Sequence, residues 1–190
     1  MKSWPKIDVA FQPFEFPPLQ LVGTKGKLVE STSFTSYVCG ITPYDATHLG
    51  HAATYLTFDL INRYELISGK KLNFIENITD IDDPLFERAK RDNQDWENLG
   101  LSQIDLFRRD MTSLRILPPK TYLAVTETID LVLEGLQILD KKGAIYRVDD
   151  DFYFDISLYL VDLPLPLEES LKIFGERGGD PDRANKRHAL

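Results

Sequence analysis

The chain has 190 residues, of which 43% are hydrophobic, and this suits one domain with a small appendage. The formal net charge is −8 and the basic residues come in scattered pairs, so the sequence does not indicate a nonspecific binder of nucleic acid. A single cysteine excludes an internal disulfide framework and fits a reducing cytoplasm. No window approaches the roughly 18 apolar residues that predict a membrane span.

Residues 1–33 are expected to form an irregular N-terminal arm, because its prolines break any helix. Around Gly23 and Gly26, residues 19–22 and 27–29 are predicted to pair as a short hairpin. Three phenylalanines of the arm are expected to pack against the main body, namely Phe11, Phe14 and Phe16.

A strand, a helix and a second strand are predicted next. Residues 34–39 contain an apolar strand-like run that Gly40 ends, residues 48–68 have helical spacing, and residues 72–75 form the second strand. Together they are expected to make one β–α–β unit of a parallel sheet. The inward face of the helix is expected to comprise Ala52, Tyr55, Leu56, Leu60 and Tyr64.

Three further helices are predicted over residues 84–92, 101–117 and 125–142. The first begins at Pro84 after a run of aspartates, which favours a helix start. The side chains expected to be buried in the second are Ile104, Phe107, Met111 and Leu114. Those expected to be buried in the third are Ile129, Val132, Leu133, Leu136 and Leu139.

The remaining residues predict smaller elements. Alternation across three aspartates indicates a β-hairpin between residues 144–148 and 152–156. Residues 167–174 predict a short helix, and residues 175–190 are polar and rich in turn formers.

The most informative run, CGITPYDATHLGH, covers residues 39–51 and follows a predicted strand. His48 and His51 open the next helix, where backbone N–H groups and the helix dipole favour a phosphate. Gly50 would leave room for a flat adenine or ribose beside the backbone. The alternative is a capped helix whose histidines are solvated. Strand, turn and helix in this order favour the phosphate site.

Cys39 has several interpretations. A lone cysteine beside a strand is most often a small core residue. It could be a nucleophile, but no catalytic relay is evident, or a zinc ligand, although no second thiol is nearby.

Two further segments could bind a ligand. Residues 77–83, NITDIDD, follow the second strand, and that edge of an α/β sheet lines the ligand crevice. The alternative is a loop with an acidic helix start, which we favour for Asp82 and Asp83. The charged, glycine-rich loop 176–181 could close over a ligand, but such loops are more often surface turns. Its residues are Glu176, Arg177, Gly178, Gly179, Asp180 and Pro181.

Residues 37–55 resemble the cysteine-activating branch of the class I aminoacyl-tRNA synthetases. HLGH at 48–51 stands where that class has its HIGH signature, and residues 77–83 resemble the second motif of the branch. Cysteinyl-tRNA synthetases typically carry CGPTVYD and a HIGNARTY-like helix start. CGITPYDATHLGHAATY and ERGGDPDR in this chain are instead similar to the ligases of the mycothiol pathway. The resemblance covers about residues 4–190.

The resemblance implies an α/β fold, namely the first half of a class I synthetase Rossmann-type nucleotide-binding fold plus a mostly helical connective insertion with a β-hairpin. Residues 1–33 would be the N-terminal arm and residues 34–92 the first βαβ part of the catalytic domain. Residues 93–190 would be the helical connective region, with the hairpin and the ERGGDP loop.

The activity that the resemblance implies is an ATP-dependent ligation, with Mg²⁺ accompanying ATP. Cysteine is activated as cysteinyl-AMP and then joined to the amine of glucosaminyl-inositol. His48 and His51 would be catalytic, and Cys39 would be one ligand of a zinc ion that binds the thiol of the substrate. The residues expected to contact cysteinyl adenylate are Cys39, Gly40, Ile41, Thr42, Thr54, Asn77, Ile78 and Thr79.

The family also uses a second cysteine, a histidine and a KMSKS-type lysine loop, which have no counterpart in these residues. We therefore expect the chain to correspond to the N-terminal half of the ligase and to lack a complete active site by itself. The expected partners are ATP, L-cysteine and glucosaminyl-inositol, without tRNA or membrane. The chain would be a cytoplasmic monomer or would associate with a companion chain that supplies the second half.

Two alternatives remain open from the sequence. One is a fragment of a cysteinyl-tRNA synthetase, which the charge of −8 argues against. The other is a noncatalytic remnant that binds a nucleotide or a protein partner.

Overall fold

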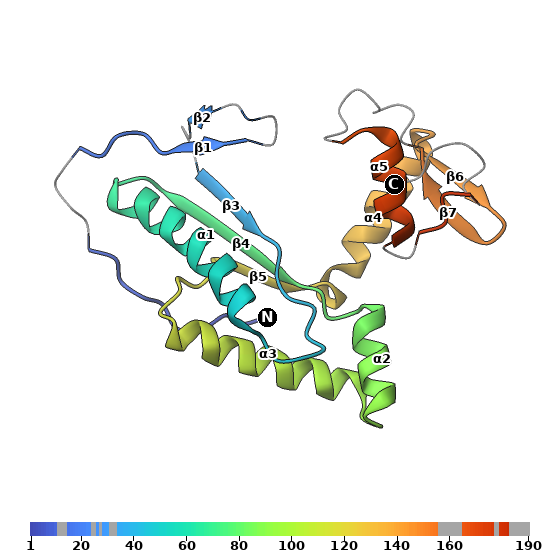
Figure 1. Cartoon of the computed structure of the whole chain (residues 1–190), viewed down its shortest axis with the longest axis horizontal. Coiled ribbons are helices and arrows are strands. Elements are labelled where there is room, and N and C mark those ends of the chain that lie inside the picture. The colour runs from blue at the N-terminus through green and yellow to red at the C-terminus, as the bar shows by residue number, and fades with distance from the viewer. Residues whose placement is uncertain are drawn as a thin grey trace. The chain divides into compact units, whose positions relative to one another are not determined.

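The chain divides into two compact units, each described here by itself (Figure 1). The first comprises Met1–Gly23 and Leu28–Thr128, and the second comprises Thr24–Lys27 and Ile129–Leu190. The structure, a computed structural model, describes residues 1–10, 15–23, 26, 28–30, 34–155, 165–176 and 179–182. Among these residues, no helix combines the length and apolar character needed to cross a membrane.

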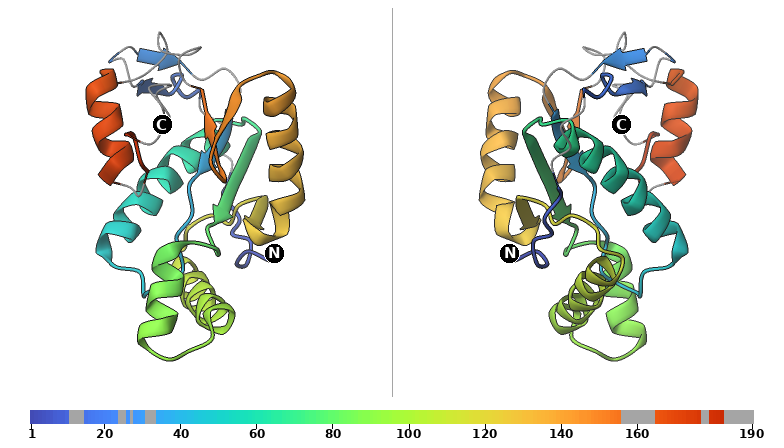
Figure 2. Two further views of the ribbon diagram at one scale, coloured as in Figure 1. Left: turned by 90° about the vertical axis from the view of Figure 1, so that its right-hand side faces the viewer. Right: turned by 90° about the vertical axis from the view of Figure 1, so that its left-hand side faces the viewer.

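A three-stranded parallel sheet organises the first unit. Its strands are β3 (Phe34–Val38), β4 (Leu72–Ile78) and β5 (Thr121–Ala124), in the order β3-β4-β5. Phe34 pairs with Leu72, and Ile75 pairs with Thr121. Helix α1 (Leu49–Ile67) connects β3 to β4 and lies along one face of the sheet (Figures 1 and 2). The predicted β–α–β unit is therefore confirmed.

Two differences from the predicted sheet matter for the site. β4 continues to Ile78, so Asn77 and Ile78 are strand residues and not loop residues. β5 was not predicted, because four residues between Pro119 and a helix-like run carry too little periodic signal. Since β5 pairs with β4, residues 93–128 belong to the sheet unit, and the compact units divide after Thr128.

The inward face of α1 is more polar than predicted. Leu60, expected to be buried, is 69% exposed, whereas Asp59, Asn62 and Glu65 are buried. Asp59 accepts a hydrogen bond from the Leu117 backbone N–H at 2.7 Å, so a polar side chain here fixes the loop before β5. The inner face of α1 therefore combines the apolar Tyr55 with polar residues, of which Asp59 has a long-range backbone partner.

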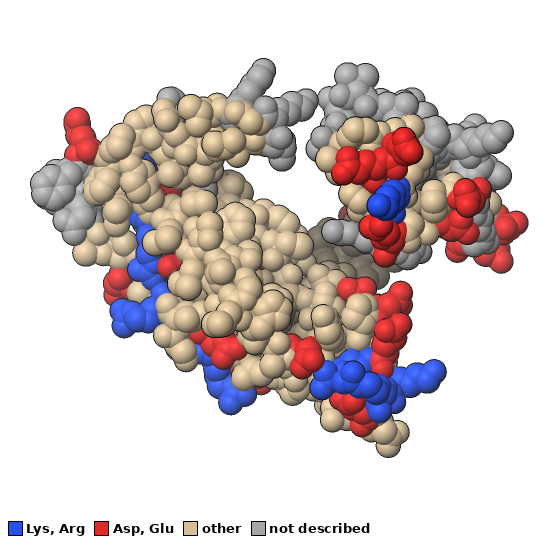
Figure 3. Space-filling view, in the orientation of Figure 1, with Lys and Arg blue, Asp and Glu red and all other residues tan. Residues whose placement is uncertain are grey.

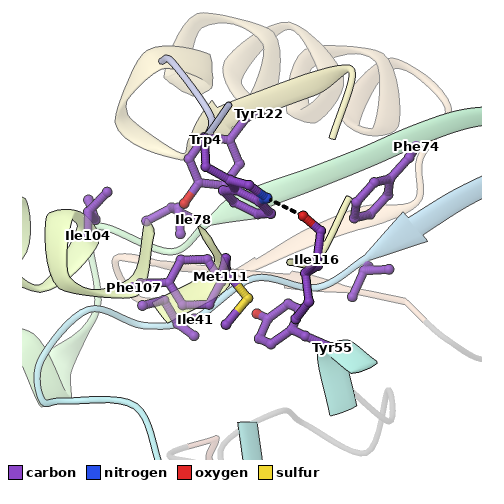
Figure 4. Close-up of a cluster of buried hydrophobic side chains, with 11 residues drawn as sticks. Trp4, Ile41, Tyr55, Phe74, Ile78, Ile104, Phe107, Met111, Ile116 and Tyr122 are labelled. Carbon is purple, nitrogen blue, oxygen red and sulfur yellow. Dashed lines mark hydrogen bonds between the residues drawn. The ribbon is translucent and has the colours of Figure 1, made fainter. Parts of the chain in front are cut away.

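Trp4 lies at the centre of the core, although the sequence placed it in an irregular arm. It is 5% exposed, and its indole N–H donates to the Ile116 carbonyl at 2.8 Å (Figure 4). Its ring packs edge to face against Phe107 and Tyr122, with centroid distances of 5.8 and 5.7 Å. Phe16 packs on Tyr64 of α1, as predicted for the phenylalanines of the arm. Phe11 and Phe14 lie outside the described residues.

The next two helices are α2 (Asp83–Arg91) and α3 (Trp96–Ser113). Asp82 caps α2, and Asp95 caps α3 by accepting from the Asn98 N–H at 2.9 Å. Helix α3 ends before Pro118, because Arg115 has a φ of 55° and leaves the helical region. Leu114 is consequently 38% exposed, not buried as predicted. Three of the predicted α3 core residues, Ile104, Phe107 and Met111, are buried.

The smaller elements follow the predicted pattern. β1 (Gln20–Val22) and β2 (Leu28–Glu30) form the antiparallel hairpin expected in the arm. In the second unit, β6 (Ile145–Val148) and β7 (Asp151–Phe154) form the other antiparallel hairpin. Helix α5 spans Leu167–Glu176.

Helix α4 (Ile129–Lys141) contradicts its predicted burial. None of its residues is buried, and Ile129 and Leu136 are 38% and 43% exposed. The hairpin of the same unit has strands of only four residues, which offer too little surface to cover an amphipathic helix.

Candidate functional site

The two histidines of the HLGH run cap helix α1 reciprocally. His48 is the N-cap residue, with φ −124° and ψ 176°, and its Nδ1 accepts from the Gly50 N–H at 3.0 Å. His51 Nδ1 accepts from the His48 N–H at 3.2 Å. The pair therefore forms a capping box, a motif usually built from a hydroxyl or short polar residue and a Glu or Gln.

The cap determines which ring nitrogen carries the proton. A nitrogen that accepts from a backbone N–H holds no proton itself, so each ring presents an N–H at Nε2. The ring centroids are 4.1 Å apart. Partial burial, and secondarily the neighbouring His48, lower the pKa of His51, which favours its uncharged form. The helix start thus offers two imidazole N–H donors beside the positive end of the helix dipole.

Gly50 makes room for the ring of its neighbour His48. A Cβ at this position would lie 2.8 Å from Cε1 and 2.9 Å from Nδ1 of His48. The space beside the Gly50 backbone therefore holds the His48 ring that makes the cap, and an approach of adenine or ribose there stays a prediction. Only the missing side chain of glycine allows the ring this position.

Asn77 at the end of β4 fixes the segment after β3. Its Oδ1 accepts from the Gly40 N–H at 3.1 Å and from the Tyr37 hydroxyl at 2.9 Å. The Thr79 N–H donates to the Ile41 carbonyl at 3.0 Å. A Cβ on Gly40 would lie 1.5 Å from the Asn77 carbonyl oxygen, so only glycine fits there. The sequence singled out Asn77 and Thr79 but not Tyr37, whose position on an exposed face gave no signal.

A hollow of 350 Å³ lies between this segment and the start of α1. It contains seven of the ten predicted catalytic and adenylate-contacting residues, and its lining comprises Cys39, Gly40, Ile41, Thr42, Tyr44, Asp45, Ala46, Thr47, His48, His51, Thr54 and Tyr55. Asn77 and Thr79 stand behind it, in contact with Gly40 and Ile41. Ile78 is fully buried in the core and does not line the hollow.

Three side-chain contacts tie the loop between β3 and α1 to the following helices. Thr42 donates to Asp82 at 3.3 Å, Arg88 pairs with Asp45 at 2.7 Å, and the Thr47 hydroxyl donates to an α3 carboxylate at 2.6 Å. The Ala46 N–H and then Arg88 lower the pKa of Asp45. Figure 3 shows basic side chains gathered at the α2 end of the first unit, next to acidic ones. No local pattern in the sequence indicates these contacts, because their partners are at least 40 residues apart.

Cys39 is exposed, and the Tyr55 hydroxyl donates to its carbonyl oxygen at 3.3 Å. Within the described part of the chain, no group of three His, Cys, Asp or Glu side chains could hold a metal ion. One thiol is too few donors for zinc, so the described residues alone do not complete a zinc site, and the role of Cys39 as a single ligand stays a prediction.

The loop at residues 176–181 belongs to the second unit. Glu176 ends α5, and the Gly179 N–H donates to the Phe174 carbonyl at 2.9 Å. A Cβ on Gly179 would lie 2.2 Å from the Phe174 ring, so this glycine is required by packing within the turn. Asp180 and Pro181 are described, whereas Arg177 and Gly178 lie outside the described residues.

Comparisons with known proteins agree with this geometry. A family model described as the tRNA synthetases class I (C) catalytic domain matches residues 26–161. "L-cysteine:1D-myo-inositol 2-amino-2-deoxy-alpha-D-glucopyranoside ligase 2" of Corynebacterium jeikeium is 48% identical over 202 residues, covering 100% of this chain and 49% of that protein. The ligase of Streptosporangium roseum with the same name, without the final number, is 49% identical over 197 residues, covering 100% of this chain and 48% of that protein. The chain thus spans about half the length of the curated relatives it matches.

Solved structures show the same fold at low sequence identity. Mycobacterium tuberculosis methionyl-tRNA synthetase bound by methionyl-adenylate has a TM-score of 0.60 and 16% identity, over 76% of this chain and 35% of that chain. A ternary LeuRS–tRNA–LeuAMS complex of Agrobacterium radiobacter has a TM-score of 0.54 and 18% identity, over 76% of this chain and 23% of that chain. The match of the family model over most of the chain shows that the chain belongs to the class I (C) tRNA synthetase catalytic-domain family.

Proposed function

We propose that this chain forms the N-terminal half of an ATP-dependent ligase that activates L-cysteine as cysteinyl-AMP and joins it to the amine of glucosaminyl-inositol. The observation that carries the proposal is the histidine capping box, whose two residues line the hollow between β3 and α1 while their Nδ1 atoms are occupied by the cap. The names of relatives with 48% and 49% identity support the choice of cysteine and the amino sugar.

In the first step, a carboxylate oxygen of cysteine attacks the α-phosphorus of ATP. The bond from that phosphorus to the bridging oxygen breaks, and pyrophosphate leaves. Negative charge builds on the phosphate oxygens in the transition state, and N–H donors fixed in advance stabilise it without reorganisation. His48 and His51 fit this role because the cap holds both rings before the substrate arrives.

In the second step, the sugar amine attacks the carbonyl carbon of cysteinyl-AMP. The bond from carbon to the phosphate oxygen breaks, AMP leaves, and the amine loses one proton as the amide forms. The adenylate would lie along the segment that Asn77 holds in place, with Cys39 to Thr42 and Thr54 beside it. Ile78 would support this segment from the core, because its side chain does not reach the hollow.

We further propose that Cys39 contributes one thiolate to a zinc ion whose other ligands lie outside the described residues. Zinc binds sulfur in preference to a hydroxyl and would favour cysteine over serine. ATP would enter with Mg²⁺, and the reaction would take place in the cytoplasm, where ATP and thiols are available. A companion segment or chain would supply the part of the relatives that these residues do not cover.

The test uses the chain together with the companion segment or chain that completes it, and a sulfamoyl analogue of cysteinyl adenylate, with binding measured by isothermal titration calorimetry. The key variant is the double substitution His48→Asn with His51→Gln. Asn is a good N-cap and Gln a good third residue of a capping box, so the helix start is kept while both ring donors are lost. We expect saturable binding by the wild type and binding at least about tenfold weaker in the variant.

Equal binding by the variant, or no binding by the wild type, would contradict the proposal. The acceptor is tested with the chain and the companion segment or chain that completes it, supplied with cysteine, ATP and either glucosaminyl-inositol or tRNA. An amide with the sugar supports the ligase, whereas charging of tRNA would favour a cysteinyl-tRNA synthetase.

A further inference from the structure

The loop that precedes His48 at the helix start forms a side-chain hydrogen bond with a residue far along the chain. The Thr47 hydroxyl donates to Asp110 Oδ2 at 2.6 Å, and the two residues are 63 positions apart. Thr47 immediately precedes the N-cap residue, so its hydrogen bond to Asp110 is the last side-chain contact of the loop before the capping box. The residues just before it, Tyr44 to Ala46, are exposed.

The turn of α3 that carries Asp110 packs on the hydrophobic core. Asp110 lies in the last turn of α3, and its own carbonyl accepts from the Leu114 N–H at 2.9 Å. Its neighbours Phe107 and Met111 are 0% and 1% exposed in the main core (Figure 4). Because the core fixes this turn of α3, the carboxylate is a fixed acceptor for the exposed part of the loop.

Asp110 does not line the hollow that holds both histidines, although it borders a neighbouring hollow with Thr47 and His48, so toward the first hollow it acts through Thr47. We propose that Asp110 is a positioning residue for the histidine pair. Its carboxylate holds Thr47 so that His48 keeps the extended backbone of an N-cap and both rings keep the proton on Nε2. The inference rests on the proposed function, because it concerns the same two N–H donors.

A second contact on the same loop, the ion pair of Arg88 with Asp45, is expected to restrain His48 less than the hydrogen bond at Thr47. Arg88 pairs with Asp45, but Asp45 is three residues before the N-cap and its side chain is 56% exposed. Exposed ion pairs contribute little and are screened by salt, whereas a partly buried hydrogen bond to a carboxylate is stronger. The Asp110 tie is therefore the one that limits motion of His48.

The test measures the tautomers of the two rings by long-range ¹H–¹⁵N correlation at neutral pH, together with binding of the adenylate analogue. The variants are Thr47→Val, Asp110→Ala and Asp110→Asn, with Asp105→Asn as the control on the same helix. We expect Thr47→Val and Asp110→Ala to mix the two ring tautomers and to weaken binding about tenfold. Asp110→Asn should fall in between, because its amide oxygen can still accept from Thr47.

The control Asp105→Asn should keep the wild-type tautomers and affinity, since that exposed side chain pairs only with Arg108 on its own helix. Unchanged tautomers in Thr47→Val, which keeps the shape of threonine, would overturn the proposal even if Asp110→Ala failed to fold. A general loss of stability without a selective change at the rings would also overturn it. If the wild type does not bind the analogue, the proposed function fails, while the tautomer measurement still decides the role of Asp110.

Discussion

Replacing Glu76 by glutamine should stabilise the protein and flatten the dependence of its stability on pH. Glu76 lies on β4 and is 0% exposed, and neither carboxylate oxygen has a hydrogen-bond partner in the described structure. Val38 and Tyr122 flank it in register on the neighbouring strands. Burial away from water disfavours the charged form and raises the pKa of Glu76 to about 8, from a starting value of 4.5.

The direction of the pH effect follows from these two values. Below pH 4.5 the carboxyl is protonated in both the folded and the unfolded chain, so it has no effect. Between pH 4.5 and about 8 the unfolded chain ionises first, and stability falls as pH rises. Each pH unit in this window is worth about 1.4 kcal/mol, so the whole window costs up to about 5 kcal/mol and the cost near pH 7 is about 3 kcal/mol.

Glutamine has nearly the same shape and cannot ionise, so Glu76→Gln should recover about 3 kcal/mol near pH 7 and almost nothing near pH 4. Urea unfolding followed by circular dichroism at several pH values measures this difference. Glu87→Gln, which changes an exposed glutamate of α2, is the matched control and should leave the slope unchanged. The reasoning is refuted if Glu76→Gln keeps the wild-type slope, or if it destabilises the protein at every pH.

Three further predictions concern the core and the hollow. Trp4→Ala should lower the free energy of unfolding by about 3–5 kcal/mol in urea titrations, because a buried ring is lost; a change below about 1 kcal/mol would contradict its place in the core. Gly40→Ala should weaken binding of the adenylate analogue and lower the melting temperature, since its Cβ would clash with the Asn77 carbonyl. Gly135→Ala, which meets no atom within 4 Å, should leave both unchanged or slightly raise stability. Finally, the analogue should slow alkylation of Cys39 by N-ethylmaleimide, and mass spectrometry showing equal rates with and without analogue would place the ligand elsewhere.

Local patterns in the sequence predicted the β–α–β unit and the start of α2 after its run of aspartates, because these depend on spacing within about 20 residues. The same patterns could not place Trp4, whose hydrogen bond reaches Ile116 over 112 positions. They also assigned an apolar inner face to α1, whereas Asp59 uses that face to bind the backbone of Leu117. Long-range polar contacts of this kind leave no periodic signal.

The sequence predicted only part of the candidate site, because local patterns detect only residues that lie close together in the chain. Residues close in sequence, such as His48 and His51, could be placed at one helix start. That the two rings cap the helix and so fix their own tautomers needed coordinates, because histidine is an uncommon capping residue. The tie from Thr47 to Asp110 depends on how α3 packs on the core, which no local pattern describes.

The central claim is that the two capped histidines present Nε2–H groups to the phosphate of an adenylate. Long-range ¹H–¹⁵N correlation of the ring nitrogens, recorded with and without the sulfamoyl analogue, tests it most directly. The account predicts Nε2–H tautomers at His48 and His51 in the free chain, and shifts of both Nε2 resonances when the analogue binds. Protons on Nδ1 in the free chain, or Nε2 resonances that do not move at saturating analogue, would contradict it.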